Sequence, residues 1–258
     1  MKYLTIIFLF ISIGLSAQQD DMFLSDFLLE DELKKENFLK KYQAKDFSVL
    51  WTQTANYRIK GMIGLNHQRI RIALTSISQN PNVAFKYSVV GKSKVRTNIC
   101  DFRGTIRIDS VLEVSQMHYG VDDMHKDSSI VAQGIVFATY EFNESPKQKH
   151  SGVFNGQLMT KWYINSKGEL KYDNIQSMSD GFMNNTFVGI WTQYDSGNSK
   201  ICNWADGRIP YSAQDFDIGA GEFSPSEKYY KFGWEQYQKA WLYGDEQARR
   251  EELAEWWK

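Results

Sequence analysis

The chain is poor in cysteine, proline and histidine, with two, four and four of them among 258 residues. Four prolines exclude a proline-rich linker protein. Two cysteines among scattered histidines match no zinc-binding spacing. The sequence also contains no P-loop, no dinucleotide-binding fingerprint and no nucleophile elbow, so we expect no cofactor.

An excess of charge of one sign is missing as well. The formal net charge is −1 at pH 7, so the chain as a whole is not built for non-specific nucleic-acid binding. Hydrophobic residues make up 42% and aromatic residues 15% of the chain. This composition excludes intrinsic disorder and collagen-like structure and predicts a globular protein with a sizeable core.

The one long apolar run lies at the N-terminus. Lys2 precedes an apolar segment from Leu4 to Leu15 that is too short to span a bilayer as a helix, and small residues at 14–17 offer a cleavage point. We therefore expect residues 1–17 to be a signal peptide, with a buried N-terminal helix as the alternative. The mature protein would be periplasmic or extracellular, without a membrane span. No cysteine stands at the cleavage point, which argues against a lipid anchor.

Helices are predicted on both sides of the centre. Within a helical segment at 18–46, residues 25–45 combine apolar and charged residues in an irregular amphipathic pattern. At the other end, 211–258 is predicted as a connection followed by helices that pack on the centre. A capping serine, a first-turn proline and Glu227 in 224–227 predict a helix start. Aromatic residues then share one helix face, and Asp245 is expected to cap a second helix. These aromatic residues are Tyr230, Trp234, Tyr237 and Trp241.

The central region, 47–210, alternates between polar and apolar residues with a period near two, which predicts β-strands. Short turns separate the strands and no helical crossover interrupts them, so the strands are expected to pair antiparallel. Four alternating stretches come first, at 57–63, 69–74, 85–89 and 102–109, and further strands are predicted at 130–142, 152–164, 169–173, 186–194 and 200–204.

A recurring apolar-x-Gly motif indicates how this sheet curves. Gly61, Gly104, Gly156 and Gly189 each follow a large apolar residue by two positions at the start of an alternating strand. Glycine on the apolar face allows a strand to coil sharply. We therefore predict a mainly β fold, an antiparallel up-and-down meander that curls into a barrel with flanking N- and C-terminal helices.

Alternating strands with glycine bends resemble the lipocalin-like (calycin) class of meander barrels, and this resemblance implies a ligand cavity in the barrel. Residues 98–106 and 217–223 are similar to uncharacterised exported proteins of Bacteroidota, a resemblance that implies no activity. Residues 189–207 also resemble a single hairpin of the MORN-type repeat.

Two polar clusters are candidate chemical sites. Asp206, Asp217 and Glu222 lie near Trp204, and paired carboxylates beside aromatic rings can hydrolyse glycosides. The alternative is a turn-rich connection. A second cluster, His118, Asp122 and His125, contains metal-ligand residue types, but its spacing matches no known metal loop, so we predict a solvated loop and no metal.

Charge is distributed unevenly along the chain. Residues 51–110 hold ten basic and two acidic residues, whereas 211–258 hold ten acidic and six basic residues. The basic strands could bind an anionic glycan or lipid head group. Alternatively, the acidic C-terminal helices pack against them, which is the interpretation we favour. The candidate ligand contacts are Arg58, Arg69, Arg71, Arg103 and Arg107, together with Trp162, Trp191 and Trp204.

Cys100 and Cys202 both fall in predicted strands. They could form a disulfide in an oxidising compartment, or they could remain buried thiols.

Together these features predict an exported, non-enzymatic β-barrel that binds a small ligand, an anionic glycan or an envelope protein. The alternative is a secreted glycan- or lipid-acting hydrolase that uses the carboxylates between Asp206 and Glu222. A barrel completely filled by aromatic side chains would argue against an internal ligand. The residues expected to decide this are Phe102, Phe154, Trp162, Phe187 and Trp191.

Overall fold

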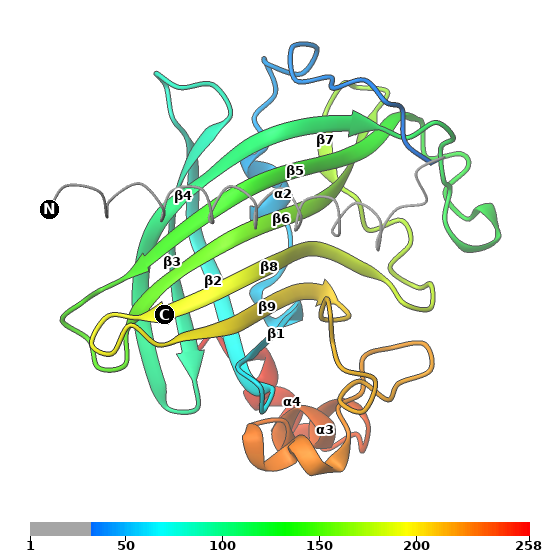
Figure 1. The fold of residues 1–258 in the computed structure, drawn as a ribbon. Coiled ribbons are helices and arrows are strands. Elements are labelled where there is room, and N and C mark those ends of the chain that lie inside the picture. The colour runs from blue at the N-terminus through cyan, green and yellow to red at the C-terminus, as the bar shows by residue number, and fades with distance from the viewer. Residues whose placement is uncertain (1–31) are drawn as a thin grey trace, which may run out of the picture.

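The computed structural model describes residues 32–258. The predicted signal peptide, 1–17, and the beginning of the predicted N-terminal helix lie outside the described residues. Within 32–258 the chain forms a closed antiparallel β-barrel of eight strands with short helices at its ends (Figure 1). The predicted fold class is therefore confirmed.

The barrel is an up-and-down meander, because each of its eight strands pairs with the next barrel strand along the chain and the last pairs with the first. Strand β9 pairs with β1 and closes the sheet, while the short β7 pairs with β6 alone. The strands are β1 (Ile59–Ile63), β2 (Gln68–Gln79), β3 (Lys86–Val95), β4 (Asn98–Glu113), β5 (Ile130–Glu144), β6 (Gly152–Asn165), β7 (Leu170–Tyr172), β8 (Met183–Gln193) and β9 (Ser199–Gly207).

Two glycines of the recurring motif stand opposite each other where neighbouring strands approach closely. Gly156 of β6 lies opposite Gly189 of β8. A Cβ atom on Gly156 would come within 2.0 Å of the Val188 carbonyl oxygen, and one on Gly189 within 2.1 Å of the Asn155 oxygen. A larger residue would force these strands apart. The tight approach therefore requires glycine at both positions, and it supports the strong coiling that barrel closure needs.

Aromatic side chains fill the middle of the barrel. Phe102, Phe154 and Phe187, each two residues before a motif glycine, are each only 1% exposed. The Phe187 and Trp204 rings stack with 4.8 Å between their centroids. The predicted orientation of these aromatic side chains toward the interior is thus confirmed, and the central section of the barrel has no room for a ligand.

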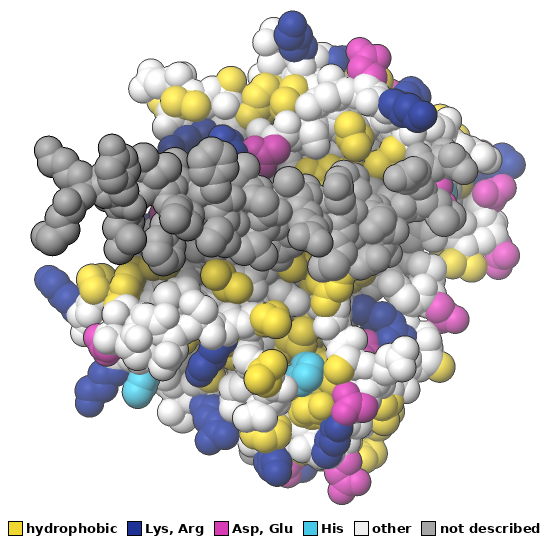
Figure 2. All heavy atoms as spheres, in the orientation of Figure 1, with side chains coloured by type: hydrophobic (Ala, Val, Ile, Leu, Met, Phe, Trp, Pro, Cys, Tyr) yellow, Lys and Arg dark blue, Asp and Glu magenta, His cyan; other side chains and the backbone are white. Residues whose placement is uncertain are grey.

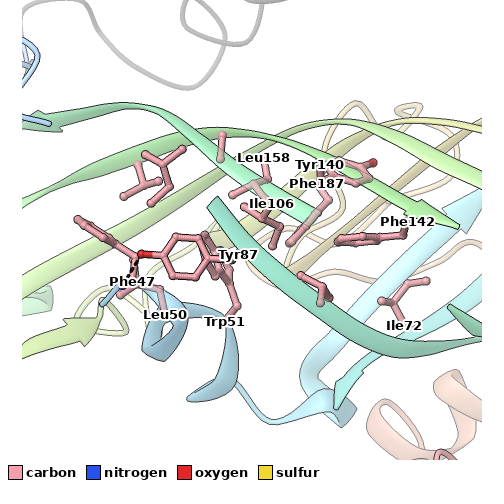
Figure 3. Close-up of a cluster of buried hydrophobic side chains, with 14 of the residues drawn as sticks. Phe47, Leu50, Trp51, Ile72, Tyr87, Ile106, Tyr140, Phe142, Leu158 and Phe187 are labelled. Carbon is pink, nitrogen blue, oxygen red and sulfur yellow. Dashed lines mark hydrogen bonds between the residues drawn. The ribbon is translucent and has the colours of Figure 1, made fainter. Parts of the chain in front are cut away.

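One end of the barrel is plugged by residues that precede β1. The short helix α2 (Ser48–Thr52) places Leu50 and Trp51 in the main core, where the Trp51 ring packs edge-on against Tyr87 (Figure 3). The Trp51 indole N–H donates to the Thr160 hydroxyl at 3.1 Å, and the Asn185 amide donates to the Leu50 carbonyl. These bonds satisfy polar groups that would otherwise be buried without partners. A 3-10 turn, η2 (Asn56–Arg58), then leads into β1.

The predicted helix over 25–45 is wrong for its described part. Residues from 32 to 45 form turns that run along the end of β4, where the Lys34 and Phe38 amides donate to the carbonyls of Glu113 and Val111 at 2.8 Å. Tyr42 reaches into the core and donates its hydroxyl to Glu113. Pairing with β4 and this aromatic anchor outweigh a helical pattern whose apolar stripe is irregular.

The C-terminal region packs on the outside of the barrel. It contains η4 (Glu227–Phe232), α3 (Glu235–Trp241) and α4 (Glu246–Leu253). Trp234 and Tyr237 form a second core with Met62 of β1. The predicted cap at Ser224 is wrong by two residues, because Pro225 pairs in an extended bridge with Asp217 and the 3-10 helix η4 begins at Glu227 after Ser226. Gly233, at a φ of 96°, then separates η4 from α3, so the predicted single helix is interrupted. Asp245 caps α4 as predicted, accepting from the Ala248 amide at 2.8 Å.

Candidate functional site

The open end of the barrel contains a cavity of about 910 Å³. Hairpin connections from β1 to β2 and from β3 to β4 line it, together with the ends of β5, β8 and β9. Helix α2 plugs the other end, so we call this cavity the barrel mouth. Much of its apolar lining comes from inward positions of the strands and one turn residue: Ile63, Leu65, Ile70, Val95, Phe154 and Trp191. Ile201 of β9 and Phe232 of η4 complete it.

Glu144, the last residue of β5, contributes a carboxylate to this apolar lining although the residue is only 3% exposed. It follows Tyr140 and Phe142 at alternate positions of β5, so the pleat of the strand turns it inward. Its oxygens accept hydrogen bonds from the Ser93 hydroxyl, from the Gly152 amide at 2.8 Å and from the Trp191 indole N–H at 2.9 Å. These three donors come from three different segments and fix the carboxylate in place.

All three of these donors are uncharged. Among residues 32–258, no Lys, Arg or His side chain forms an ion pair with Glu144. Burial raises the pKa of the Glu144 carboxyl, and the hydrogen bonds from Ser93, Trp191 and Gly152 oppose that rise only in part. The barrel mouth therefore combines apolar walls with one acidic group that lacks a counter-charge.

Basic side chains occur only toward the edge of the mouth. Arg96, in the β3–β4 turn, donates to the Gln68 side chain at 3.2 Å, and the Lys200 ammonium lies 5.7 Å from the centroid of the Trp191 ring. His150 also lines the cavity. Arg96, Lys200 and His150 are exposed, so solvent screens their electrostatic effect on the buried Glu144 carboxylate.

Both cysteines are buried free thiols, and the structure contains no bond between Cys100 and Cys202. Burial raises the pKa of the Cys100 thiol to about 11 and raises that of Cys202 well above its usual value; the Glu144 charge raises both further. The thiols are thus neutral at physiological pH and add no second negative charge beside the carboxylate.

Only one of the three candidate tryptophans reaches the mouth. Trp162 and Trp204, at 0% and 1% exposure, belong to the filled core, whereas Trp191 lines the cavity and bonds to Glu144. Glu144 and Ser93 were not among the sequence candidates. The sequence feature that could have identified Glu144 is its position in β5, where it follows Tyr140 and Phe142 at alternate positions that face inward.

The candidate arginines mostly pair with acidic groups of the same chain. Arg69 forms two hydrogen bonds with the Glu252 carboxylate of α4, at 2.7 and 2.5 Å, and Arg71 donates to the Glu252 carbonyl at 2.7 Å. Arg103 and Arg107 are exposed, and Arg107 lies 3.0 Å from Asp109. On the face shown in Figure 2, basic and acidic side chains are interspersed rather than gathered into one basic patch.

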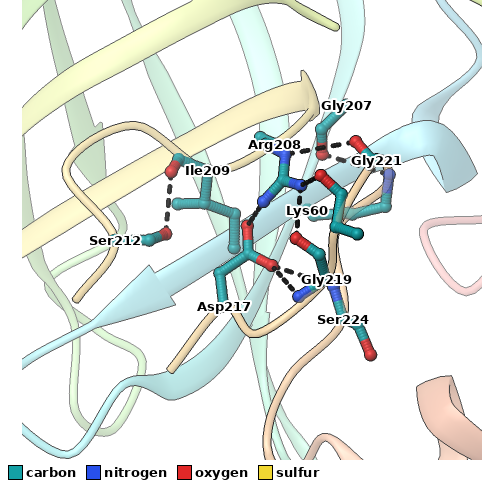
Figure 4. Close-up of polar contacts among 10 residues, drawn as sticks. Lys60, Gly207, Arg208, Ile209, Ser212, Asp217, Gly219, Gly221 and Ser224 are labelled. Carbon is teal, nitrogen blue, oxygen red and sulfur yellow. Dashed lines mark hydrogen bonds and ion pairs between the residues drawn. The ribbon is translucent and has the colours of Figure 1, made fainter. Parts of the chain in front are cut away.

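Two of the three candidate carboxylates, Asp206 and Asp217, have their own separate partners. Asp206 is buried and accepts from Arg58 at 3.0 Å and from the Tyr172 hydroxyl at 2.8 Å. Asp217 accepts from Arg208 at 2.7 Å, and Arg208 also donates to carbonyls of the same loop (Figure 4). Glu222 is exposed. This arrangement holds a connection together and does not place two free carboxyl groups across a cleft.

The residues His118, Asp122 and His125 do not converge. Within the described part of the chain, no three His, Cys, Asp or Glu side chains form a group able to hold a metal ion. Asp122 lies in the short turn η3 (Val121–Asp123), and the backbone of His118 bonds to the side chain of Gln133.

Comparisons with protein-family models, with curated proteins and with solved structures gave no match to this chain. Across residues 32–258, no helix has the length and apolar character needed to cross a bilayer. The coordinates define the class of the protein as a closed, eight-stranded antiparallel β-barrel with a filled middle, one plugged end and one hollow end. The resemblance to exported Bacteroidota proteins stays a prediction.

Proposed function

We propose that the protein binds a small, largely apolar molecule in the barrel mouth, in the manner of a lipocalin-like (calycin) barrel. The observation that carries this proposal is the cavity of about 910 Å³, lined by apolar side chains and a few polar groups. Ligand sites of proteins are typically concave, mostly apolar and about 300–1,000 Å³ in volume.

The filled middle of the barrel restricts where a ligand could lie. Phe154 forms part of both the core and the cavity lining, so a ligand would rest on top of the aromatic core rather than pass through it. This favours a compact molecule or the end of a longer one. We further propose that the protein acts outside the cytoplasm, as the apolar segment at 4–15 suggests, and that it binds its ligand without chemical conversion.

Binding can be tested with N-phenyl-1-naphthylamine, a neutral apolar dye that fluoresces in apolar surroundings. We expect saturable binding of one dye molecule per chain. Val95→Trp places a bulky side chain at a half-buried position that faces the cavity. It should weaken dye binding by about tenfold or more, because the filled site loses over ~1.4 kcal/mol of binding free energy for the dye.

Val90→Trp is the matched control, since Val90 lies on the same strand in the opposite phase and is not part of the cavity lining. It should bind the dye as the wild type does. Absence of saturable binding, or equal binding by both variants, would contradict the proposal.

A further inference from the structure

The lining of the barrel mouth contains an unusual electrostatic element. Glu144 is buried and accepts only neutral donors, and no cation compensates it among the described residues. Burying an ionised carboxylate without a counter-charge is costly, even when hydrogen bonds offset part of the cost. A group of this kind in the wall of a cavity is a candidate for recognising an opposite charge on a ligand.

We infer that the ligand carries a protonated amine at its inner end, which pairs with the Glu144 carboxylate. This inference rests on the proposed function. The ligand class is a primary amine with an apolar alkyl or aryl body, whose ammonium group would lie at the floor of the mouth while its body contacts Ile63, Ile70 and Val95.

The hydrogen-bond capacity of Glu144 agrees with this placement. A carboxylate can accept about four hydrogen bonds, and Ser93, Gly152 and Trp191 supply three. Ser93 and Trp191 line the cavity themselves, and no fourth donor to this carboxylate is found among residues 32–258, so one acceptor position is left beside the cavity. An ammonium group brings both a donor and the missing positive charge.

The other charged and titratable groups around the mouth do not take over this role. Arg96, Lys200 and His150 stand at the exposed edge, and the thiols of Cys100 and Cys202 stay neutral. The Tyr194 hydroxyl donates to the backbone carbonyl of Glu144 and not to its carboxylate. The cations at the edge would favour a ligand whose outer end is neutral or anionic, which adds a direction to the binding mode.

The inference is tested with three probes of equal chain length: decylamine, decanol and decanoic acid. Their affinities are measured at pH 7 by isothermal titration calorimetry. We expect the wild type to bind the amine about tenfold more tightly than the alcohol, because a charge-assisted hydrogen bond is roughly twice as strong as a neutral one. The acid, whose carboxylate can face only the cations at the exposed edge, should bind more weakly than the amine.

Glu144→Gln keeps the shape of the side chain and removes its charge. It should abolish the preference for the amine while it still binds N-phenyl-1-naphthylamine and decanol. Glu141→Gln is the control, because Glu141 lies on the same strand and is exposed. It should retain the preference.

The wild-type comparison stands even if Glu144→Gln does not fold. Equal affinities for amine and alcohol, or a preference for the acid, would overturn the inference while leaving a binding barrel in place. Failure of every probe and of the dye to bind would instead contradict the proposed function itself. A preference for the amine that persists in a folded Glu144→Gln variant would also overturn the inference.

Discussion

Glu252→Gln offers a sharp test of how the C-terminal helices are attached to the barrel. The Glu252 and Arg69 side chains are 5% and 10% exposed and form two hydrogen bonds, so solvent screens this ion pair little. Arg69 also lies 5.3 Å from the centroid of the Trp234 ring. Removing the carboxylate charge would leave the guanidinium buried without compensation.

Loss of one partner of a buried ion pair costs about 3–5 kcal/mol. We therefore expect the free energy of unfolding of Glu252→Gln, measured with urea, to fall by about that amount. Hydrogen exchange should accelerate most in α4, because Glu252 belongs to this helix and its carboxylate attaches it to β2. Glu251→Gln is the matched control, since Glu251 is exposed, and it should change stability by less than about 0.5 kcal/mol.

The same pair predicts a dependence of stability on pH. Burial by itself would raise the pKa of Glu252, but the hydrogen bonds and charge of Arg69 outweigh burial and the pKa is lowered overall. A carboxyl group whose pKa is depressed in the folded state stabilises the protein above its unfolded pKa of about 4.3. That stabilisation should disappear as the pH falls through the folded pKa. If Glu252→Gln matched the wild type in stability, or lost stability over the same acidic range, the pair would not anchor α4.

Three further predictions concern the barrel itself. Trp51→Phe should lower the free energy of unfolding by roughly 1–3 kcal/mol, because the buried Thr160 hydroxyl loses its indole donor; no change in urea unfolding would show that the plug adds no stability through this bond. Gly189→Ala should destabilise by more than about 2 kcal/mol, since the new Cβ would meet the Asn155 carbonyl at 2.1 Å, and a thermal transition equal to that of wild type would contradict the close approach. Cys202, buried and with a raised pKa, should resist iodoacetamide at pH 8 until the protein is unfolded, as read by mass spectrometry; rapid labelling of the native protein would refute its placement.

The barrel could be predicted from the sequence because its signals are local and repeated. The alternation of residues sets which face of each strand is buried, and Phe102, Phe154 and Phe187 beside the motif glycines identified that face correctly. The charge imbalance along the chain likewise anticipated the contact between Arg69 and the acidic α4. Each of these features depends on periodicity or on composition summed over a long segment.

The sequence did not reveal the plug or the barrel mouth. Residues from 32 to 45 have a helix-like pattern, but pairing with β4 determines their conformation, and that partner is far away in sequence. Alternation along β5 indicates that Glu144 faces inward. It does not indicate whether an inward position lies in the filled middle of the barrel or at its hollow end. That distinction depends on the stagger of the strands around the closed sheet.

The division of the barrel into a filled middle and a hollow end leaves the turns around the entrance outside the core that holds the sheet closed. Four hairpin turns frame the mouth, at 64–67, 96–97, 145–151 and 194–198, while the aromatic core and the plug lie below them. Exchanging these turns would reshape the entrance without touching the side chains that hold the sheet closed. Such a scaffold can acquire new ligands by turn replacement alone, which makes it a practical starting point for engineered binding proteins.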